Sequence, residues 1–157
     1  MSSAIENACQ ALQSNKMVII QDDADRENEG DFVCHGATCS TEMVNFMAQF
    51  GRGLICLALP AEHIDQLELP LQPVRGTSNF HSPFTVSIDA AFDVTTGISC
   101  HERAHTIRTA ARSDCQPSDL LTPGHIFPLR AHPQGLYARK GHTEASLALM
   151  QLAGLSM

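Results

Sequence analysis

The sequence predicts one domain of mixed α and β structure that spans residues 1–157. Segments with apolar residues at helical spacing interleave with short β-rich runs along the whole chain. A length of 157 residues, 43% of them hydrophobic, is enough for a single core. No internal repeat, linker or low-complexity tract divides the chain. Because aromatic residues make up only 5% and Trp is absent, aliphatic side chains must fill that core.

The first part of the chain has two helix patterns and three short strand patterns. Ser3 and Glu6 have the spacing of a capping box and open an amphipathic segment. Ser40 or Thr41 is placed to cap a second helix, and Gly51 suits its C-terminal end. The expected helices cover residues 3–15 and 41–50. The expected strands cover residues 17–20, 32–35 and 54–59, of which the first and the third are expected to be buried.

The remainder predicts two strands, two helices and two connections. Ser99 and Glu102 form a second capping-box pattern, and Thr143 is placed to cap the last helix. Pro128 lies inside a strand pattern, where proline suits only an edge or a bulge. The expected strands cover residues 84–89 and 126–131, the helices 99–112 and 143–154, and the connections 70–83 and 117–124.

The charge of the chain is unevenly distributed. Residues 1–100 carry a net charge of -9 and residues 101–157 carry +2, for a total of -7. This balance and the scarcity of aromatic residues exclude an obvious nucleic-acid site. No apolar run approaches the roughly 18 residues of a membrane span, and the N-terminus lacks the pattern of a signal peptide. Six cysteines without a CxxC pair favour reduced thiols in a cytoplasmic protein.

Six of the 17 acidic residues lie between Asp22 and Asp31. The acids at positions 23, 25, 27, 29 and 31 would share one side of an extended chain, where they repel each other unless a cation relieves the charge. Oxygen ligands favour a hard ion such as Mg²⁺ or Mn²⁺. An EF-hand fits poorly, because counting from Asp23 places Asn28 at the glycine position. A solvated acidic loop is the alternative.

Three further features are ambiguous when taken alone. Residues 139–143, Arg-Lys-Gly-His-Thr, precede a predicted helix and suit either a phosphate site or a solvated loop; they are not a P-loop. His125 follows Pro-Gly and is either a turn residue or an acid/base group. Cys56 lies in an apolar run, where a small buried thiol is the simpler interpretation.

One motif points to a different function. His101-Glu-Arg-Ala-His105 matches the HExxH pattern of zinc proteases, with both histidines on one face of a predicted helix and Glu102 as the base. Arg108 stands where the longer metzincin pattern requires glycine. An exposed polar helix is the alternative.

Six motifs occur along the chain in the following order: Asp25-Arg-Glu-Asn-Glu-Gly-Asp31, Gly53-Leu-Ile-Cys-Leu57, Phe84-Thr-Val-Ser87, Thr95-Thr-Gly-Ile-Ser99, Pro123-Gly-His-Ile-Phe-Pro-Leu-Arg130 and Gly141-His-Thr-Glu-Ala145. Taken together, these motifs closely resemble the 3,4-dihydroxy-2-butanone 4-phosphate synthase family of riboflavin biosynthesis. The resemblance runs from about residue 5 to residue 154.

The resemblance implies an α+β fold, a mixed sheet with helices packed on its faces, and a homodimer. It implies a lyase that converts D-ribulose 5-phosphate to L-3,4-dihydroxy-2-butanone 4-phosphate plus formate with Mg²⁺, Mn²⁺ being possible. It also assigns roles: metal ligands Glu27 and His142; catalytic residues His125, Asp31 and Cys56; and substrate-binding residues Arg26, Glu27, Asp31, Arg139, Lys140, Gly141, His142 and Thr143. On this interpretation His101 and His105 are incidental.

The resemblance further implies a short strand after the last helix, with a catalytic glutamate, beyond Met157 of the printed sequence. Three explanations stay open: a divergent paralogue with little activity, an enzyme in which another carboxylate or a partner chain substitutes, or a sequence that stops short of the full protein. The alternative function is therefore a catalytically impaired paralogue that binds a sugar phosphate and a metal.

Overall fold

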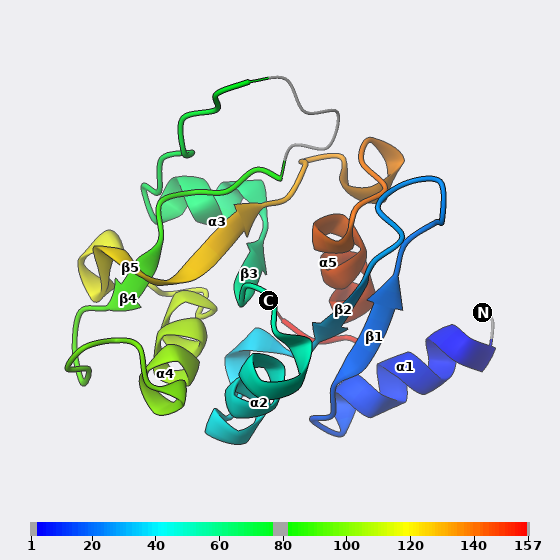
Figure 1. The fold of residues 1–157 in the computed structure, drawn as a ribbon, viewed down its shortest axis with the longest axis horizontal. Helices are drawn as coiled ribbons and strands as arrows, with labels where there is room; N and C mark the ends of the chain where they lie inside the picture. The colour runs from blue at the N-terminus through cyan, green and yellow to red at the C-terminus, as the bar shows by residue number, and fades with distance from the viewer. Residues whose placement is uncertain (1–2, 77–81, 157) are drawn as a thin grey trace.

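The computed structural model describes residues 3–76 and 82–156, and in this part of the chain helices and strands alternate (Figure 1). Single helical turns lie at Gly36–Thr38 (η1), Met47–Gly51 (η2), Pro117–Asp119 (η3) and Gly135–Tyr137 (η4). The longer elements are α1 (Ser3–Gln13), β1 (Val18–Gln21), β2 (Gly30–Val33), α2 (Thr41–Phe46), β3 (Cys56–Leu59), α3 (Ala61–Gln66), β4 (Ile88–Ala90), α4 (Cys100–Ala110), β5 (Leu120–Arg130) and α5 (His142–Leu152).

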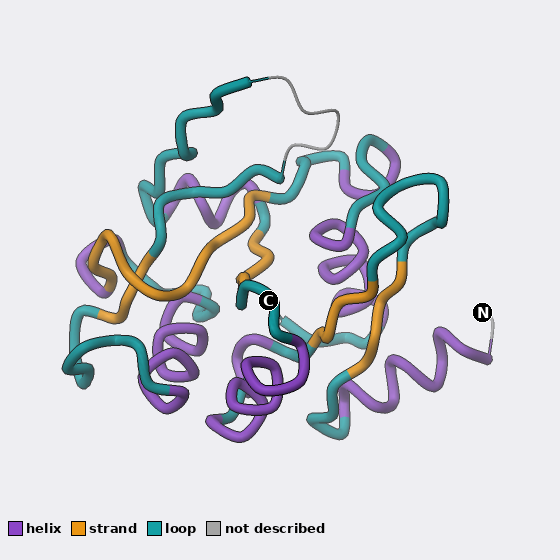
Figure 2. The backbone as a smooth tube through the Cα atoms, in the orientation of Figure 1, coloured by secondary structure: helices purple, strands orange, loops and turns teal. Residues whose placement is uncertain are grey.

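The described strands form two sheets, which Figure 2 shows separated by loops and helices. β1 and β2 are antiparallel, with Val18 opposite Val33. The second sheet has the order β3-β5-β4 and is mixed, because β5 runs parallel to β3 and antiparallel to β4. This arrangement confirms the expected α+β fold with a mixed sheet and packed helices.

β5 differs from its prediction in two ways. It begins at Leu120, so residues 120–124 belong to the strand rather than to a connection. It is also the middle strand, so Pro128 does not lie at an edge of the sheet, which was one of the two positions that the sequence allowed for it. The Pro128 carbonyl accepts a hydrogen bond from the backbone N–H of Thr85, whose own carbonyl accepts from Gln72 Nε2. Proline has no N–H to donate to the facing carbonyl of Thr85, and the side-chain amide of Gln72 supplies that hydrogen bond instead.

The helices also correct some boundaries. α3 was not predicted, because its six residues provide too short a pattern. The helix expected over residues 41–50 ends as α at Phe46 and continues as the wider turn η2. Gly141, rather than Thr143, is the N-cap of α5. The capping box of Ser99 and Glu102 on α4 is confirmed.

Two apolar clusters hold the elements in place. The larger joins β3, β4 and β5 to α2, α3 and α4 through residues such as Val44, Leu59 and Ile126. The smaller joins α1, β2 and α5 through Leu12, Val33 and Met150. Because β2 and α5 share this second cluster, the acidic segment that leads into β2 is held beside the start of α5.

A membrane span finds no support among the helices of the described residues, since none is both long enough and apolar enough to cross a bilayer.

Candidate active site

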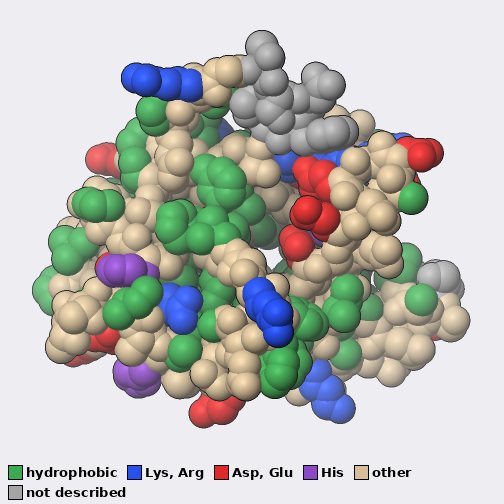
Figure 3. All heavy atoms as spheres, in the orientation of Figure 1, with side chains coloured by type: hydrophobic (Ala, Val, Ile, Leu, Met, Phe, Trp, Pro, Cys, Tyr) green, Lys and Arg blue, Asp and Glu red, His purple; other side chains and the backbone are tan. Residues whose placement is uncertain are grey.

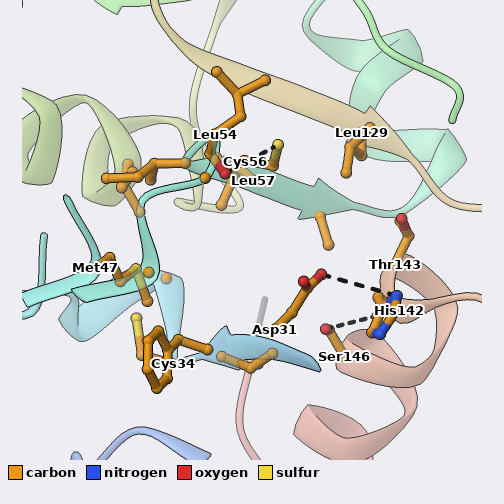
Figure 4. A pocket seen from close by; sticks show the side chains of 18 of the residues that line it. Asp31, Cys34, Met47, Leu54, Cys56, Leu57, Leu129, His142, Thr143 and Ser146 are labelled. Carbon is orange, nitrogen blue, oxygen red and sulfur yellow. Dashed lines mark hydrogen bonds and ion pairs between the residues drawn. The ribbon is translucent and has the colours of Figure 1, made fainter. Parts of the chain in front are cut away.

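A cleft of about 440 Å³ lies between β2, β3 and α5. Asp31 contributes to it from β2, Cys56 from β3, and His142 and Thr143 from the first turn of α5. Figure 4 shows Asp31 pointing across the cleft toward His142, and in Figure 3 acidic side chains line one side of a hollow in the face shown. Residues more than 100 positions apart in sequence thus meet in one cavity.

The acidic segment is a turn, not an extended chain. Residues 24–27 form turns and Asn28 has a φ of 55°, in the left-handed region that Asn tolerates. The carboxylate of Asp22 closes the turn, accepting the backbone N–H groups of Glu27 at 3.1 Å and Glu29 at 2.9 Å. The expectation that alternate acids share one side is therefore wrong, and Asp22 becomes a site residue that the sequence did not single out.

Asp22 is held in its charged form. Burial raises its pKa, but hydrogen bonds from the backbone of Glu29, from the guanidinium of Arg26 and from the backbone of Glu27 outweigh this and lower the pKa to about 2. Arg26 donates to Asp22 at 2.6 Å and to Glu27 at 2.9 Å. This one cation thus compensates two carboxylates of the turn.

His142 faces the acidic turn from the first residue of α5. Its Nε2 lies 3.2 Å from the carbonyl oxygen of Glu29, a contact in which Nε2–H donates. Its Nδ1 then presents a lone pair toward Glu27 Oε2 at 3.7 Å and Asp31 Oδ2 at 3.9 Å. A carbonyl that fixes the tautomer in this way is typical of histidines that bind metals through the other ring nitrogen.

Among the described residues, Asp22, Glu27 and His142 form a cluster that could hold a metal ion, with one potential ligand atom from each residue lying within 4.8 Å of the others. Two carboxylates and one imidazole suit a hard divalent cation that completes its coordination with water or substrate oxygen atoms. The predicted ligands Glu27 and His142 are therefore brought together, and Asp22 joins them.

The basic segment of residues 139–143 leads into α5 and includes its N-cap, Gly141, and its first two residues. Glu144 is fully buried and accepts a hydrogen bond from Arg139 Nη1 at 2.8 Å and from the backbone N–H of His132 at 2.9 Å. A Cβ at Gly141 would lie 2.8 Å from Arg139 Nη1, so only glycine fits there without displacing the arginine. Lys140 is exposed. The predicted basic segment is thus ordered by a buried carboxylate.

Cys56 lines the cleft as predicted. Burial, assisted by the negative charge of Asp31, raises the pKa of its thiol to about 11. The thiol therefore stays protonated at neutral pH, and it donates to the carbonyl oxygen of Leu54 at 3.7 Å. A neutral thiol can donate a hydrogen bond but is a poor nucleophile.

His125 is not among the residues that line the cleft. It lies on β5, and Asp89 of β4 accepts a hydrogen bond from its backbone N–H at 3.0 Å and from its Nδ1 at 2.8 Å. This carboxylate keeps a proton on Nδ1, so in the neutral ring Nε2 carries the lone pair. The side chain of His125 is 39% exposed. The structure therefore shows an oriented, accessible histidine outside the cation cluster.

Glu102 organises the loop of residues 95–99. Its carboxylate accepts from the backbone N–H and the hydroxyl of Thr95 and from Ser99. These contacts leave it no role as a zinc-protease base. His101 faces Thr41, and His105 contacts the carbonyl oxygen of Phe92, so the two rings do not converge. The zinc-protease hypothesis is therefore wrong.

The Glu102 contacts predict a pH-dependent stability. Hydrogen bonds from the backbone and the hydroxyl of Thr95 outweigh burial and, with Ser99, lower the pKa of Glu102 from 4.5 to about 2. The stabilisation is therefore fully present above about pH 4.5 and is lost as the pH falls through about 2. We expect Glu102→Gln to lower the melting temperature at neutral pH, and the deficit to shrink on acidification. A deficit that does not change with pH would contradict this.

The chain matches the family model described as 3,4-dihydroxy-2-butanone 4-phosphate synthase over residues 6–157. It is 45% identical over 150 residues to a protein of that name from Agrobacterium fabrum, covering 96% of this chain and 70% of the relative. It is 49% identical over 156 residues to riboflavin biosynthesis protein RibBA of Aquifex aeolicus, covering 98% of this chain and 38% of that protein.

Solved structures show the same similarity. A crystal structure of 3,4-dihydroxy-2-butanone 4-phosphate synthase in complex with two magnesium ions matches with a TM-score of 0.92 and 41% identity, covering 97% of this chain and 71% of that one. A two-domain synthase from A. baumannii matches with a TM-score of 0.91 and 45% identity, covering 97% of this chain and 45% of that one.

Proposed function

Because this chain belongs to the 3,4-dihydroxy-2-butanone 4-phosphate synthase family, we propose that its cleft is the active site at which D-ribulose 5-phosphate is converted. The chain is a lyase of riboflavin biosynthesis that forms L-3,4-dihydroxy-2-butanone 4-phosphate and formate from that substrate. The observation that carries the assignment of the site is the cluster of Asp22, Glu27 and His142, in which His142 also lines this cleft.

Magnesium is the cation that we propose for this cluster, with Mn²⁺ as a substitute. A related synthase has been solved with two magnesium ions, and the oxygen-rich donor set here suits such an ion. When bound, a divalent cation stabilises negative charge on the oxygen atoms of an enediolate. Glu27 and His142 would bind the cation. Asp22 would also bind it, while its hydrogen bonds to the backbone N–H groups of Glu27 and Glu29 keep the turn closed.

The remaining predicted site residues, of which Asp31, Cys56 and Thr143 line the cleft, are assigned roles in binding and proton transfer. Arg139, held by Glu144, and the backbone N–H groups at the start of α5 would bind the substrate phosphate, with Lys140, Gly141 and Thr143 around it. Asp31 faces the cleft and would accept a proton from carbon during enolisation. The neutral thiol of Cys56 would donate a hydrogen bond to a substrate oxygen. Arg26 would contact substrate beside Glu27.

A homodimer would bring His125 to the reaction. The imidazole is exposed, is oriented by Asp89 and lies outside the cleft of its own chain. Exposed apolar side chains such as Phe92, Ile98 and Leu121 occur on the segments beside Asp89 and His125. We propose that this surface packs against a second copy, so that the His125 of one chain transfers protons in the cleft of the other. We place the enzyme in the cytoplasm, where its six free thiols stay reduced.

Closure of the acidic turn over substrate predicts protection from proteolysis. Arg26 lies in the turn, and a cation and a sugar phosphate in the cluster would hold this segment against α5. We expect D-ribulose 5-phosphate with Mg²⁺ to slow tryptic cleavage after Arg26 several-fold. Cleavage after the exposed Arg112, beyond α4, is the internal control and should not change. Equal rates at Arg26 with and without ligands would contradict closure.

The activity is tested by incubating the protein with D-ribulose 5-phosphate or D-ribose 5-phosphate in the presence of Mg²⁺ and following the products by phosphorus NMR. The ketose has its carbonyl at C2, so a base can remove the proton from C3, whereas the aldose has its carbonyl at C1 and can enolise only toward C2. We expect a new four-carbon phosphate from the ribulose compound alone. Binding of ribulose 5-phosphate without conversion would instead support a catalytically impaired sugar-phosphate-binding protein.

A further inference from the structure

The paired strands β4 and β5 contain a bulge that carries His125. The pairing shifts between Ile88 and Asp89, so that, within these two described strands, residues 122–125 of β5 have no partner on β4. A bulge interrupts the ladder of backbone hydrogen bonds and changes the direction in which a side chain leaves the sheet. The backbone N–H groups within the bulge therefore need acceptors other than the backbone of the neighbouring strand.

Two side chains of β4 and the residue before it supply these acceptors. Ser87 Oγ accepts a hydrogen bond from the backbone N–H of Gly124 at 3.1 Å. Asp89 Oδ1 accepts from the backbone N–H of His125 at 3.0 Å, and its Oδ2 accepts from the ring nitrogen Nδ1 of the same residue at 2.8 Å. One carboxylate thus holds both the backbone and the ring of His125, which fixes the direction of the imidazole.

The carboxylate of Asp89 is buried beneath the loop of residues 95–99. A Cβ at Gly97 would overlap this carboxylate, so only glycine allows the loop backbone to approach it so closely. Glu102 of α4 holds the same loop in place through its hydrogen bonds. Because the loop keeps water away from Asp89, the carboxylate attracts a positively charged imidazole more strongly than it would in bulk solvent.

We propose that Asp89 is a positioning residue for the lyase reaction, which keeps His125 in the tautomer with a proton on Nδ1 and a lone pair on Nε2. This inference rests on the proposed role of His125 in proton transfer. With Nδ1–H directed at Asp89, Nε2 is the ring nitrogen left to take a proton from the substrate. The ring is then positively charged, and the facing carboxylate stabilises this charge until Nε2 returns the proton.

Asp89→Asn separates this role from a purely structural one. The backbone N–H of His125 still needs an oxygen acceptor, so the amide oxygen of the new side chain keeps the place of Oδ1. The amide nitrogen then takes the place of Oδ2 and donates to Nδ1, which can accept only when it carries no proton. The substitution therefore preserves the cap of the bulge and moves the ring proton to Nε2.

The first measurement is the tautomer of His125 in the whole protein without substrate. Long-range proton–nitrogen NMR of isotope-labelled histidine distinguishes the two ring nitrogens at alkaline pH, where imidazoles are neutral, and the spectrum of His125→Asn identifies the signals. We expect the proton on Nδ1 in the wild type and on Nε2 in Asp89→Asn. Ser87→Ala removes the other side-chain acceptor of the bulge and, as the matched control, should keep the wild-type tautomer. A wild-type ring with its proton on Nε2, or an unchanged tautomer in Asp89→Asn, would overturn the proposal.

The second measurement is the rate of formate release from D-ribulose 5-phosphate with Mg²⁺. We expect Asp89→Asn to lower kcat by about 10²-fold or more and to change KM by less than about threefold, because proton transfer is affected and substrate binding is not. Ser87→Ala should keep kcat within about threefold of the wild type. An equal loss in both variants, or an unchanged kcat in an Asp89→Asn protein with the reversed tautomer, would refute the positioning role.

The two measurements also distinguish a failure of this inference from a failure of the proposed function. A wild-type protein that releases no formate would refute the proposed lyase activity. The NMR comparison needs no substrate, so it would still decide whether Asp89 sets the tautomer of His125.

Discussion

Replacing Glu27 by Gln is expected to lower the rate of formate release by at least about 100-fold, because the carboxylate is a proposed direct ligand of the cation. Removing residues that only hydrogen-bond to metal ligands already lowers metal affinity or activity by about 10- to 100-fold. The substitution keeps the shape of the side chain and removes its charge. Glu27 Oε2 lies 3.7 Å from His142 Nδ1 and accepts from Arg26 at 2.9 Å, so the loss falls in the centre of the cluster. The measurement is formate released at saturating substrate and Mg²⁺.

Asp23→Asn is the matched control for this experiment. Asp23 lies in the same turn, is exposed, and loses the same charge on substitution, but it is not part of the Asp22–Glu27–His142 cluster. It should retain activity within a few-fold of the wild type. A Glu27→Gln protein as active as Asp23→Asn, or an Asp23→Asn protein as impaired as Glu27→Gln, would show that the effect is not specific to the cluster.

Mixing two inactive variants is expected to restore activity if His125 acts in the cleft of a partner chain. His125→Asn and Glu27→Gln should each lower the rate of formate release by roughly 10²- to 10⁴-fold, which is the usual effect of removing an acid/base group. Random pairing makes half of the dimers mixed, and each mixed dimer has one intact site of two, so about a quarter of wild-type activity should return. Formate release after co-expression or joint refolding measures this.

The control mixture is Glu27→Gln with His142→Asn. Both residues lie in one cluster of the same chain, so every cleft in any mixed dimer carries one defect, and no activity should return. Recovery in this control would mean that the cluster itself is shared between chains. Absence of recovery in the His125→Asn mixture would place His125 at the cleft of its own chain or outside the reaction.

The fold was largely predictable because its signals are local. The capping box of Ser99 and Glu102 and the alternating or apolar runs located most elements to within a few residues. α3 escaped prediction because six residues give too little periodicity, and the early start of β5 escaped because Pro123 and Gly124 resemble a turn. The middle position of β5 depends on tertiary pairing, which the sequence alone does not encode visibly.

The site was predictable in its members but not in its geometry. The acidic run contained the relevant carboxylates, but the assumption of an extended chain grouped the wrong ones. The turn around Asn28 instead brings Asp22 toward Glu27 and His142. Asp89 was missed for the same reason, because its partner His125 is 36 positions away and meets it only when β4 pairs with β5. Glu144, which orders Arg139, was visible only as part of a motif.

Formate produced from D-ribulose 5-phosphate, with Mg²⁺ and again after removal of divalent cations with EDTA, tests the central claim most directly. The wild-type protein should release one formate for each sugar phosphate consumed, and should release essentially none with EDTA until Mg²⁺ is restored. A protein that binds ribulose 5-phosphate and Mg²⁺ but releases no formate, or that releases formate equally well in EDTA, would contradict the account of a cation-dependent lyase built on Asp22, Glu27 and His142.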